Sequence, residues 1–131
     1  FKGVDIPGTG FSVGVDRLLF AILQLGQIDS DIKKPAIVCV MDKKYLKNYY
    51  EILKILRDNG INSEIFLDSE KNLGKQLTYA NKRGCPVAVI CGENEFKENT
   101  ITLKNLLGAK GENNQITIQK ENLINEIKKF V

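Results

Sequence analysis

The architecture of the chain is set by Ala36-Ile37-Val38-Cys39-Val40-Met41, an uninterrupted apolar run of strand length. A run that is apolar on both faces predicts a strand buried in the middle of a sheet. Asp42 follows the run and is a suitable N-cap for a helix at about 43–59. That helix is expected to bury one stripe of side chains at steps of three and four: Leu46, Tyr49, Leu53 and Leu56.

The same alternation continues toward the C-terminus. We expect a strand at 62–67, a helix at about 73–82 and a strand at 86–92. Strands that alternate with helices predict a parallel sheet with right-handed crossovers. A short polar link at 93–99 is too short for a crossover helix. The alternating strand after it, at 100–104, is therefore expected to run antiparallel to its neighbour.

The C-terminal part completes the sheet. A loop at 106–114 is expected to lead to a short strand at 115–118 and a final helix at 120–130. The predicted fold class is α/β: a mixed, mostly parallel sheet of five strands flanked by three helices, all within residues 36–131.

The segment before this sheet has a different character. Residues 1–13 are expected to form the end of a strand and a Gly-rich turn, followed by a helix at 15–25. That helix is apolar on nearly all sides, which is typical of a helix buried on several faces. The chain also begins at Phe1 without Met. We therefore expect residues 1–26 to be the remnant of a larger domain, joined by a polar linker at 27–35 to a domain at 36–131.

Composition narrows the possible functions. The 131 residues carry a net charge of +3 and include no histidine. The charge permits an RNA partner without demanding one. The lack of histidine excludes histidine acid–base catalysis, a Ser-His-Asp triad and histidine metal sites within this chain, and we expect no metal site. No apolar run approaches the ~20 residues of a membrane span.

The three cysteines, Cys39, Cys85 and Cys91, are odd in number and lack the C-x-x-C spacing. We interpret them as buried, reduced thiols, which is typical of a cytoplasmic protein.

The glycines near the N-terminus suggest a nucleotide site. The sequence there is Gly10-Phe11-Ser12-Val13-Gly14-Val15-Asp16-Arg17-Leu18-Leu19. It is not a dinucleotide fingerprint, because the third glycine comes one residue late, and not a P-loop, because no lysine follows Gly14. The pattern G-x-x-x-G-x-[DE]-R at the start of a helix resembles motif 3 of class II aminoacyl-tRNA synthetases, most closely that of the histidyl enzymes.

A second resemblance covers the rest of the chain. The expected order of strands and helices is similar to the anticodon-binding domain shared by the histidyl, prolyl, threonyl and glycyl enzymes. The segments Ile90-Cys91-Gly92-Glu93-Asn94-Glu95-Phe96 and Asn99-Thr100-Ile101-Thr102-Leu103-Lys104-Asn105-Leu106 resemble that family's G-E-x-E and G-T-V-x-V-K-D-L patterns. Asn99 and Asn105 depart from the usual Gly and Asp, and the loop before Gln115 is longer than expected.

The resemblance implies a role in adenylation for the N-terminal segment. Arg17 would be the catalytic cation that neutralises charge on the ATP phosphates. Gly10, Ser12 and Gly14 would line the adenylate pocket. Motifs 1 and 2 are absent, so the resemblance implies activity, with ATP and Mg²⁺, only for a longer parent protein; no cofactor is expected on this fragment. The alternative for Arg17 is a surface arginine after a Gly-rich turn.

The resemblance also implies an anticodon site after the third strand. Single-stranded RNA is read by stacking and by hydrogen bonds to base edges. Glu93 and Glu95 would accept hydrogen bonds from guanine, Phe96 would stack on a base, and Lys104 would meet a phosphate or a base edge. The alternatives are solvated carboxylates, a hydrophobic plug and an ordinary exposed lysine on a strand.

The partners implied are the anticodon loop of histidine tRNA and, for a homodimeric cytoplasmic parent, ATP and histidine. Three other interpretations stay open. A regulatory paralogue of histidine biosynthesis is disfavoured by the retained Gly14-Val15-Asp16-Arg17. A prolyl or threonyl enzyme is disfavoured by the short distance from Arg17 to the second domain. A flavodoxin-like binding module is disfavoured because no glycine follows the first strand of the sheet.

Overall fold

The computed structural model describes residues 3, 7–26, 33–68, 72–108 and 114–131. The chain divides into two compact units, residues 1–32 and 33–131. Each unit is described by itself below.

The N-terminal unit contains helix α1 (Val15–Gln24). Gly14 is its N-cap, and the Gly14 carbonyl accepts a hydrogen bond from the N–H of Leu18 at 2.9 Å. Residues 7–14 have no regular secondary structure, and the strand expected ahead of them falls largely on residues outside the described ones. No side chain of α1 is buried, and Phe20 is 65% exposed. Most of the apolar surface of this helix is therefore exposed.

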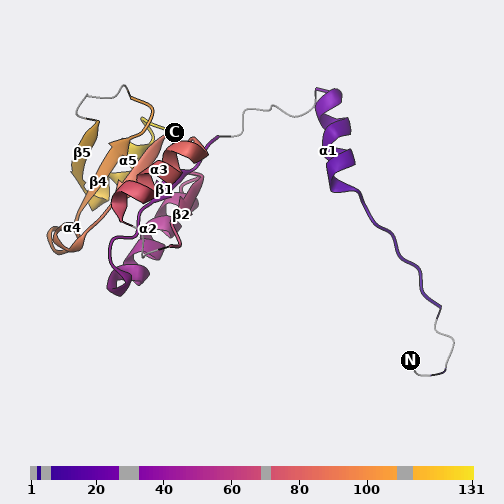
Figure 1. The fold of residues 1–131 in the computed structure, drawn as a ribbon, viewed down its shortest axis with the longest axis horizontal. Helices are drawn as coiled ribbons and strands as arrows, with labels where there is room; N and C mark the ends of the chain where they lie inside the picture. The colour runs from indigo at the N-terminus through magenta and orange to yellow at the C-terminus, as the bar shows by residue number, and fades with distance from the viewer. Residues whose placement is uncertain (1–2, 4–6, 27–32, 69–71, 109–113) are drawn as a thin grey trace. The chain divides into compact units, whose positions relative to one another are not determined.

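The second unit is built on one sheet, shown in Figure 1. Its strands are β1 (Ala36–Val38), β2 (Ser63–Ile65), β3 (Val87–Ile90), β4 (Thr100–Asn105) and β5 (Gln115–Gln119). They lie in the order β2-β1-β3-β4-β5. β1 pairs parallel with β2 and β3, whereas β4 pairs antiparallel with β3 and β5. The predicted mixed five-stranded sheet is confirmed.

Helices connect and cover these strands. They are α2 (Leu46–Asp58), α3 (Leu73–Arg83), α4 (Glu93–Glu98) and α5 (Leu123–Ile127), with 3₁₀ turns at Lys43–Tyr45 and Lys120–Asn122. The described part of this unit has one α-helix more than expected, because the link at 93–99 folds into α4. Asn99 ends α4 with a φ of +54°, a left-handed conformation that asparagine tolerates better than most residues. The helix expected at 120–130 is shorter, beginning with a 3₁₀ turn.

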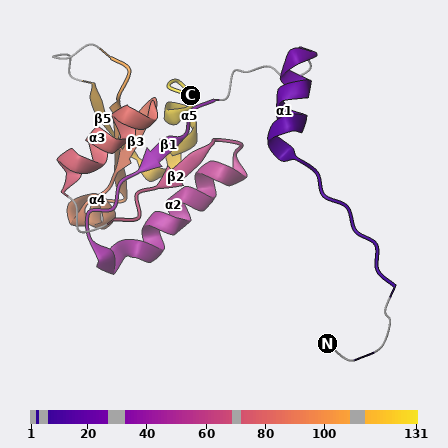
Figure 2. The ribbon, with the colours of Figure 1, turned by 45° about the vertical axis from the view of Figure 1, so that its right-hand side comes forward.

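Two hydrophobic clusters lie on opposite faces of the sheet. One face packs against α2 and α5, and the other against α3, an arrangement that can be followed in Figure 2. The predicted stripe of α2 is wrong at Leu46, which is 41% exposed, whereas Tyr49, Leu53 and Leu56 are buried. Leu46 is the first residue of α2, and the preceding residue, Tyr45, packs against the core in its place.

The three cysteines are buried, as predicted. Burial raises the pKa of the thiols of Cys39 and Cys91 to about 12. Both thiols are therefore neutral at physiological pH and serve as small apolar side chains.

The described residues include neither a membrane-spanning helix nor a cluster of metal ligands. No helix among them has the length and apolarity needed to cross a bilayer. Nor do those residues hold a group of three or more His, Cys, Asp or Glu side chains placed to bind a metal ion.

Candidate nucleic-acid interface

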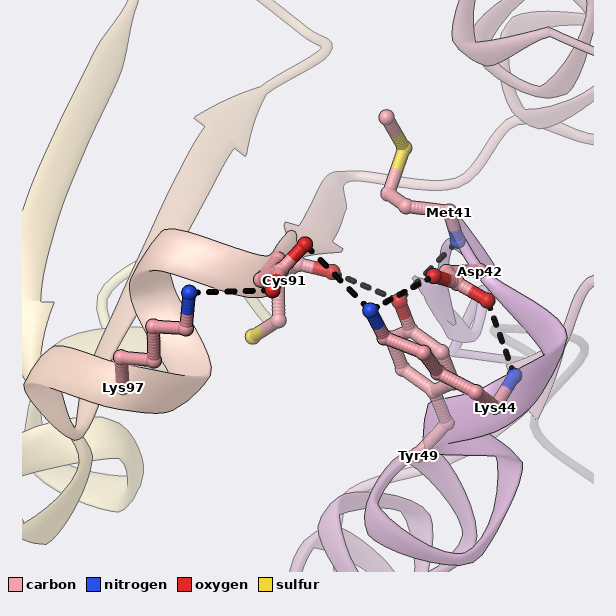
Figure 3. Close-up of polar contacts among 7 residues, drawn as sticks. Met41, Asp42, Lys44, Tyr49, Cys91 and Lys97 are labelled. Carbon is pink, nitrogen blue, oxygen red and sulfur yellow. Dashed lines mark hydrogen bonds and ion pairs between the residues drawn. The ribbon is translucent and has the colours of Figure 1, made fainter.

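The carboxyl ends of β1 and β3 form one charged edge of the sheet. The two strands are parallel neighbours with Val38 opposite Val89, so the chain leaves both at the same edge. β1 leads to Met41 and Asp42, and β3 leads to Gly92 and α4. Ligands of open α/β sheets bind outside the carboxyl ends of the strands. This edge is therefore the candidate site, and Figure 3 shows its polar contacts.

Tyr49 ties the two strand exits together. Its hydroxyl donates a hydrogen bond to the carbonyl of Cys91 at 2.7 Å and accepts one from the N–H of Met41 at 3.1 Å. The side chain is fully buried, and burial raises the pKa of its hydroxyl, which stays protonated and able to donate. Asp42 then accepts a hydrogen bond from the N–H of Lys44 at 2.9 Å and caps the turn into α2.

Glu93 lies between two lysines at this edge. Its carboxylate is 3.0 Å from Nζ of Lys97 and 3.3 Å from Nζ of Lys44, which also lies 3.5 Å from Asp42. The hydrogen bonds from Lys97 and then Lys44 lower the pKa of Glu93. The exposed carboxylate is therefore ionised, and both lysines remain accessible to solvent.

We expect Lys97→Gln to raise the pKa of Glu93 toward its usual range. The pKa is lowered in the folded state, so the stabilising contribution of Glu93 is present above its unfolded pKa and is lost as the pH falls through the folded value. The change is measured by following the Glu93 carboxyl carbon by NMR against pH. Lys47→Gln, at another exposed lysine of this unit, serves as the control. An unchanged titration in the Lys97 variant would contradict the assigned cause.

Glu95 and Phe96 are engaged within the protein. Glu95 accepts a hydrogen bond from the N–H of Gly92 at 2.9 Å and so caps α4. A side chain at Gly92 would place its Cβ 3.0 Å from that carboxylate, so the glycine gives the cap its room. Phe96 lies half-buried against the core, with its ring centroid 4.7 Å from that of Tyr45 and 5.2 Å from that of Tyr49. Both residues therefore shape the edge.

Lys104 lies away from this group. It is half-exposed on β4, opposite Ala88 and Gln115, whereas the α4 end of β4 is Thr100. Four residues of strand correspond to about 13 Å. The structure thus brings together Glu93, Glu95 and Phe96 but not Lys104.

The N-terminal candidates share one exposed segment of the other unit. Gly10 and Ser12 precede α1, Gly14 caps it, and Arg17 lies in its first turn. A Cβ added at Gly10 would meet no atom within 4 Å, and one at Gly14 would meet only the stem of Arg17 at 3.8 Å.

Sequence reasoning missed Lys44, Lys97 and Tyr45 at the edge. Two signals were available. Parallel strands end at the same edge, which places residues after β1 beside residues after β3. Glu93 and Lys97 also have the i,i+4 spacing of helical ion pairs, which becomes visible only if the link is assigned as a helix.

The mixed sheet and the charged edge at its strand exits define an α/β ligand-binding domain. The anticodon binding domain family matches residues 35–130, and the chain belongs to that family.

Relatives and solved structures agree with this assignment. The chain is 83% identical over 131 residues to the histidine–tRNA ligase of Pelagibacter ubique (strain HTCC1062), covering 100% of this chain and 28% of that protein. It is 44% identical over 111 residues to the histidine–tRNA ligase of Jannaschia sp. (strain CCS1), covering 84% and 22%. The chain thus spans less than a third of these relatives.

Histidyl-tRNA synthetase from Nostoc sp. PCC 7120 superposes with a TM-score of 0.67 at 28% identity, over 89% of this chain and 28% of that one. The RNA binding domain of threonyl-tRNA synthetase from Cryptosporidium parvum Iowa II, at 16% identity and a TM-score of 0.65 over 74% and 23% of the two chains, shares the fold. The resemblance to the C-terminal part of histidyl-tRNA synthetases is confirmed.

Proposed function

We propose that this chain is the C-terminal part of a histidine–tRNA ligase and that its second unit recognises the anticodon loop of histidine tRNA. The observation that carries the proposal is the 83% identity over the whole chain to one such ligase. That identity favours it over a regulatory paralogue or a prolyl or threonyl enzyme. The proposed division is a catalytic-domain remnant at 1–26, a linker at 27–35 and the anticodon-binding domain at 36–131.

The charged edge supplies the chemistry that a guanine-containing loop requires. Glu93 presents an ionised, exposed acceptor for guanine N–H groups, and Lys44 and Lys97 beside it suit the adjoining phosphates. In this proposal Glu95, on the same helix, also accepts hydrogen bonds from guanine. The rings of Phe96 and Tyr45 offer an aromatic surface on which a base can stack. Lys104 would contact the RNA farther along β4.

The N-terminal segment is proposed to serve the adenylation site of the parent enzyme. Arg17 is an exposed guanidinium with the geometry to pair with phosphate oxygens. The open space around Gly10 leaves room for a nucleotide beside the backbone. In this proposal Ser12 and Gly14 line the same adenylate pocket. The parent would be a cytoplasmic homodimer that uses ATP and Mg²⁺ to activate histidine, with the remaining groups of the site supplied from outside this chain.

Binding of histidine tRNA transcripts with altered anticodons tests the proposal. We expect replacement of an anticodon guanine to weaken binding by about 5- to 150-fold, since a well-placed contact to a base edge contributes about 1–3 kcal/mol of discrimination. Glu93→Gln should reduce that discrimination, because the amide nitrogen repels the guanine N–H. Glu51→Gln, at an exposed position of α2, should not. Equal affinity for every transcript would overturn the proposal.

A further inference from the structure

The opposite edge of the sheet, where β1 and β2 begin, carries a concentration of positive charge. Two adjoining hollows lie there and share Lys33, Gly60, Ile61 and Asn62. The cations that line them come from the approach to β1 and from the ends of α2, α3 and α5. These five residues, Lys33, Lys34, Arg57, Arg83 and Lys128, are called the amino-edge patch.

Local contacts hold the patch in place. Arg57 donates hydrogen bonds from Nε and Nη2 to the carbonyl of Ser63 at 3.2 and 2.9 Å, which orients its guanidinium and leaves its other N–H groups free to donate. Asn62 donates to the carbonyl of Lys33 at 3.2 Å. The stem of Lys34 lies 3.8 Å from where a Cβ on Gly84 would be. These contacts restrict the guanidinium of Arg57 and the backbone at Lys33 before a ligand binds. Less conformational entropy is therefore lost on binding.

The five cations of the patch outnumber the negative groups beside it. Among the described residues that line the two hollows, Glu64 is the one acidic side chain, and it lies 3.6 Å from Nε of Arg83. Val131, the last of the 131 residues, also lines one hollow and carries the terminal carboxylate. No carboxylate in the described part of the chain pairs with Lys33, Lys34 or Lys128. Cations at the ends of α2, α3 and α5 are favoured by the helix dipoles. The dipoles do not account for Lys33 and Lys34, which precede a strand.

We propose that the amino-edge patch binds the phosphodiester backbone of RNA, as a second contact independent of the anticodon site. Arg57 offers a planar fork for phosphate oxygens, and the lysines offer point charges beside it. Phosphate contacts position a protein on its RNA without reading bases. The choice of RNA as partner rests on the proposed function, but the site lies at the other edge of the sheet.

The test measures binding of a histidine tRNA transcript by the 131-residue chain at several salt concentrations. The double variant Lys33→Gln, Lys128→Gln removes two exposed lysines that hold no described ion pair. It should weaken binding equally for native and altered anticodons and reduce the slope of log K against log salt by about 2, or about 1 per phosphate contact. The matched control is Lys75→Gln, Lys82→Gln, whose lysines line a different hollow beside Phe66 and Tyr79.

The outcomes separate this inference from the proposed function. An unchanged slope in the Lys33, Lys128 double variant, or an equal loss in the control pair, overturns the amino-edge patch even if anticodon discrimination persists. A reduced salt slope in this variant, with the slope of the control pair unchanged, supports the amino-edge patch even if the chain does not discriminate between anticodons. Thermal unfolding of each variant verifies that the fold is retained.

Discussion

Gln76→Leu is expected to lower the free energy of unfolding of the second unit by about 2–4 kcal/mol, since each buried backbone group left without a partner costs about 1–3 kcal/mol. Gln76 is 1% exposed on α3. Its Nε2 donates to the carbonyl of Val40 at 2.7 Å, and its Oε1 accepts from the N–H of Val40 at 3.0 Å. The amide thus replaces a neighbouring strand just beyond the end of β1. Leucine has a similar size but supplies neither group.

Chemical denaturation and thermal melting measure this effect. The midpoint should fall by more than about 8 °C, because a domain of this size loses about 4–8 °C per kcal/mol. Asn81→Leu introduces the same side chain at an exposed position of α3 and should change stability little. A Gln76→Leu protein as stable as the parent chain would show that water or a shifted backbone satisfies Val40.

Tyr49→Phe should be destabilising by about 2–3 kcal/mol, because it leaves the carbonyl of Cys91 and the N–H of Met41 without the partner that they share. The ring itself stays, so packing against the core is retained and the cost is assigned to the hydroxyl. The variant should also weaken binding of histidine tRNA, since Tyr49 holds the strand exits that carry Lys44 and Glu93.

The neighbouring Tyr50 provides the control. It is 47% exposed, and Tyr50→Phe removes the same atom from a surface ring. Equal stability of the two variants would mean that the hydroxyl of Tyr49 is not needed to hold the strand exits.

Individual elements show how far sequence reasoning reached. The run Ala36–Met41 predicted a central strand, because a strand that is covered on both faces carries apolar side chains at every position. Its regular part ends at Val38, and Met41 is 42% exposed, but Cys39 and Val40 stay buried. Gln76 pairs with both backbone groups of Val40. That pairing joins residues 36 positions apart, a contact that no local pattern reveals.

The candidate site shows the same contrast between what is local in the sequence and what the fold brings together. Glu93, Glu95 and Phe96 were found together because they are neighbours in sequence, and Lys104 was grouped with them only through the family pattern. The short helix α4 turns Glu95 and Phe96 inward as cap and packing residue. Whether either one also meets RNA stays a prediction.

Periodicity and composition alone determined that this chain forms an α/β domain with a mixed sheet and has an apolar helix ahead of it. The reason is that the pattern of alternate or continuous apolar residues is a local property of the sequence. Only the tertiary structure decided which charges meet. Lys44 joins Glu93 because parallel pairing brings two strand exits together, and Lys33 joins Arg57 and Lys128 because several helices end where the strands begin. Such juxtapositions depend on the order of the strands in the sheet, which the spacing of elements along the chain indicates only in part.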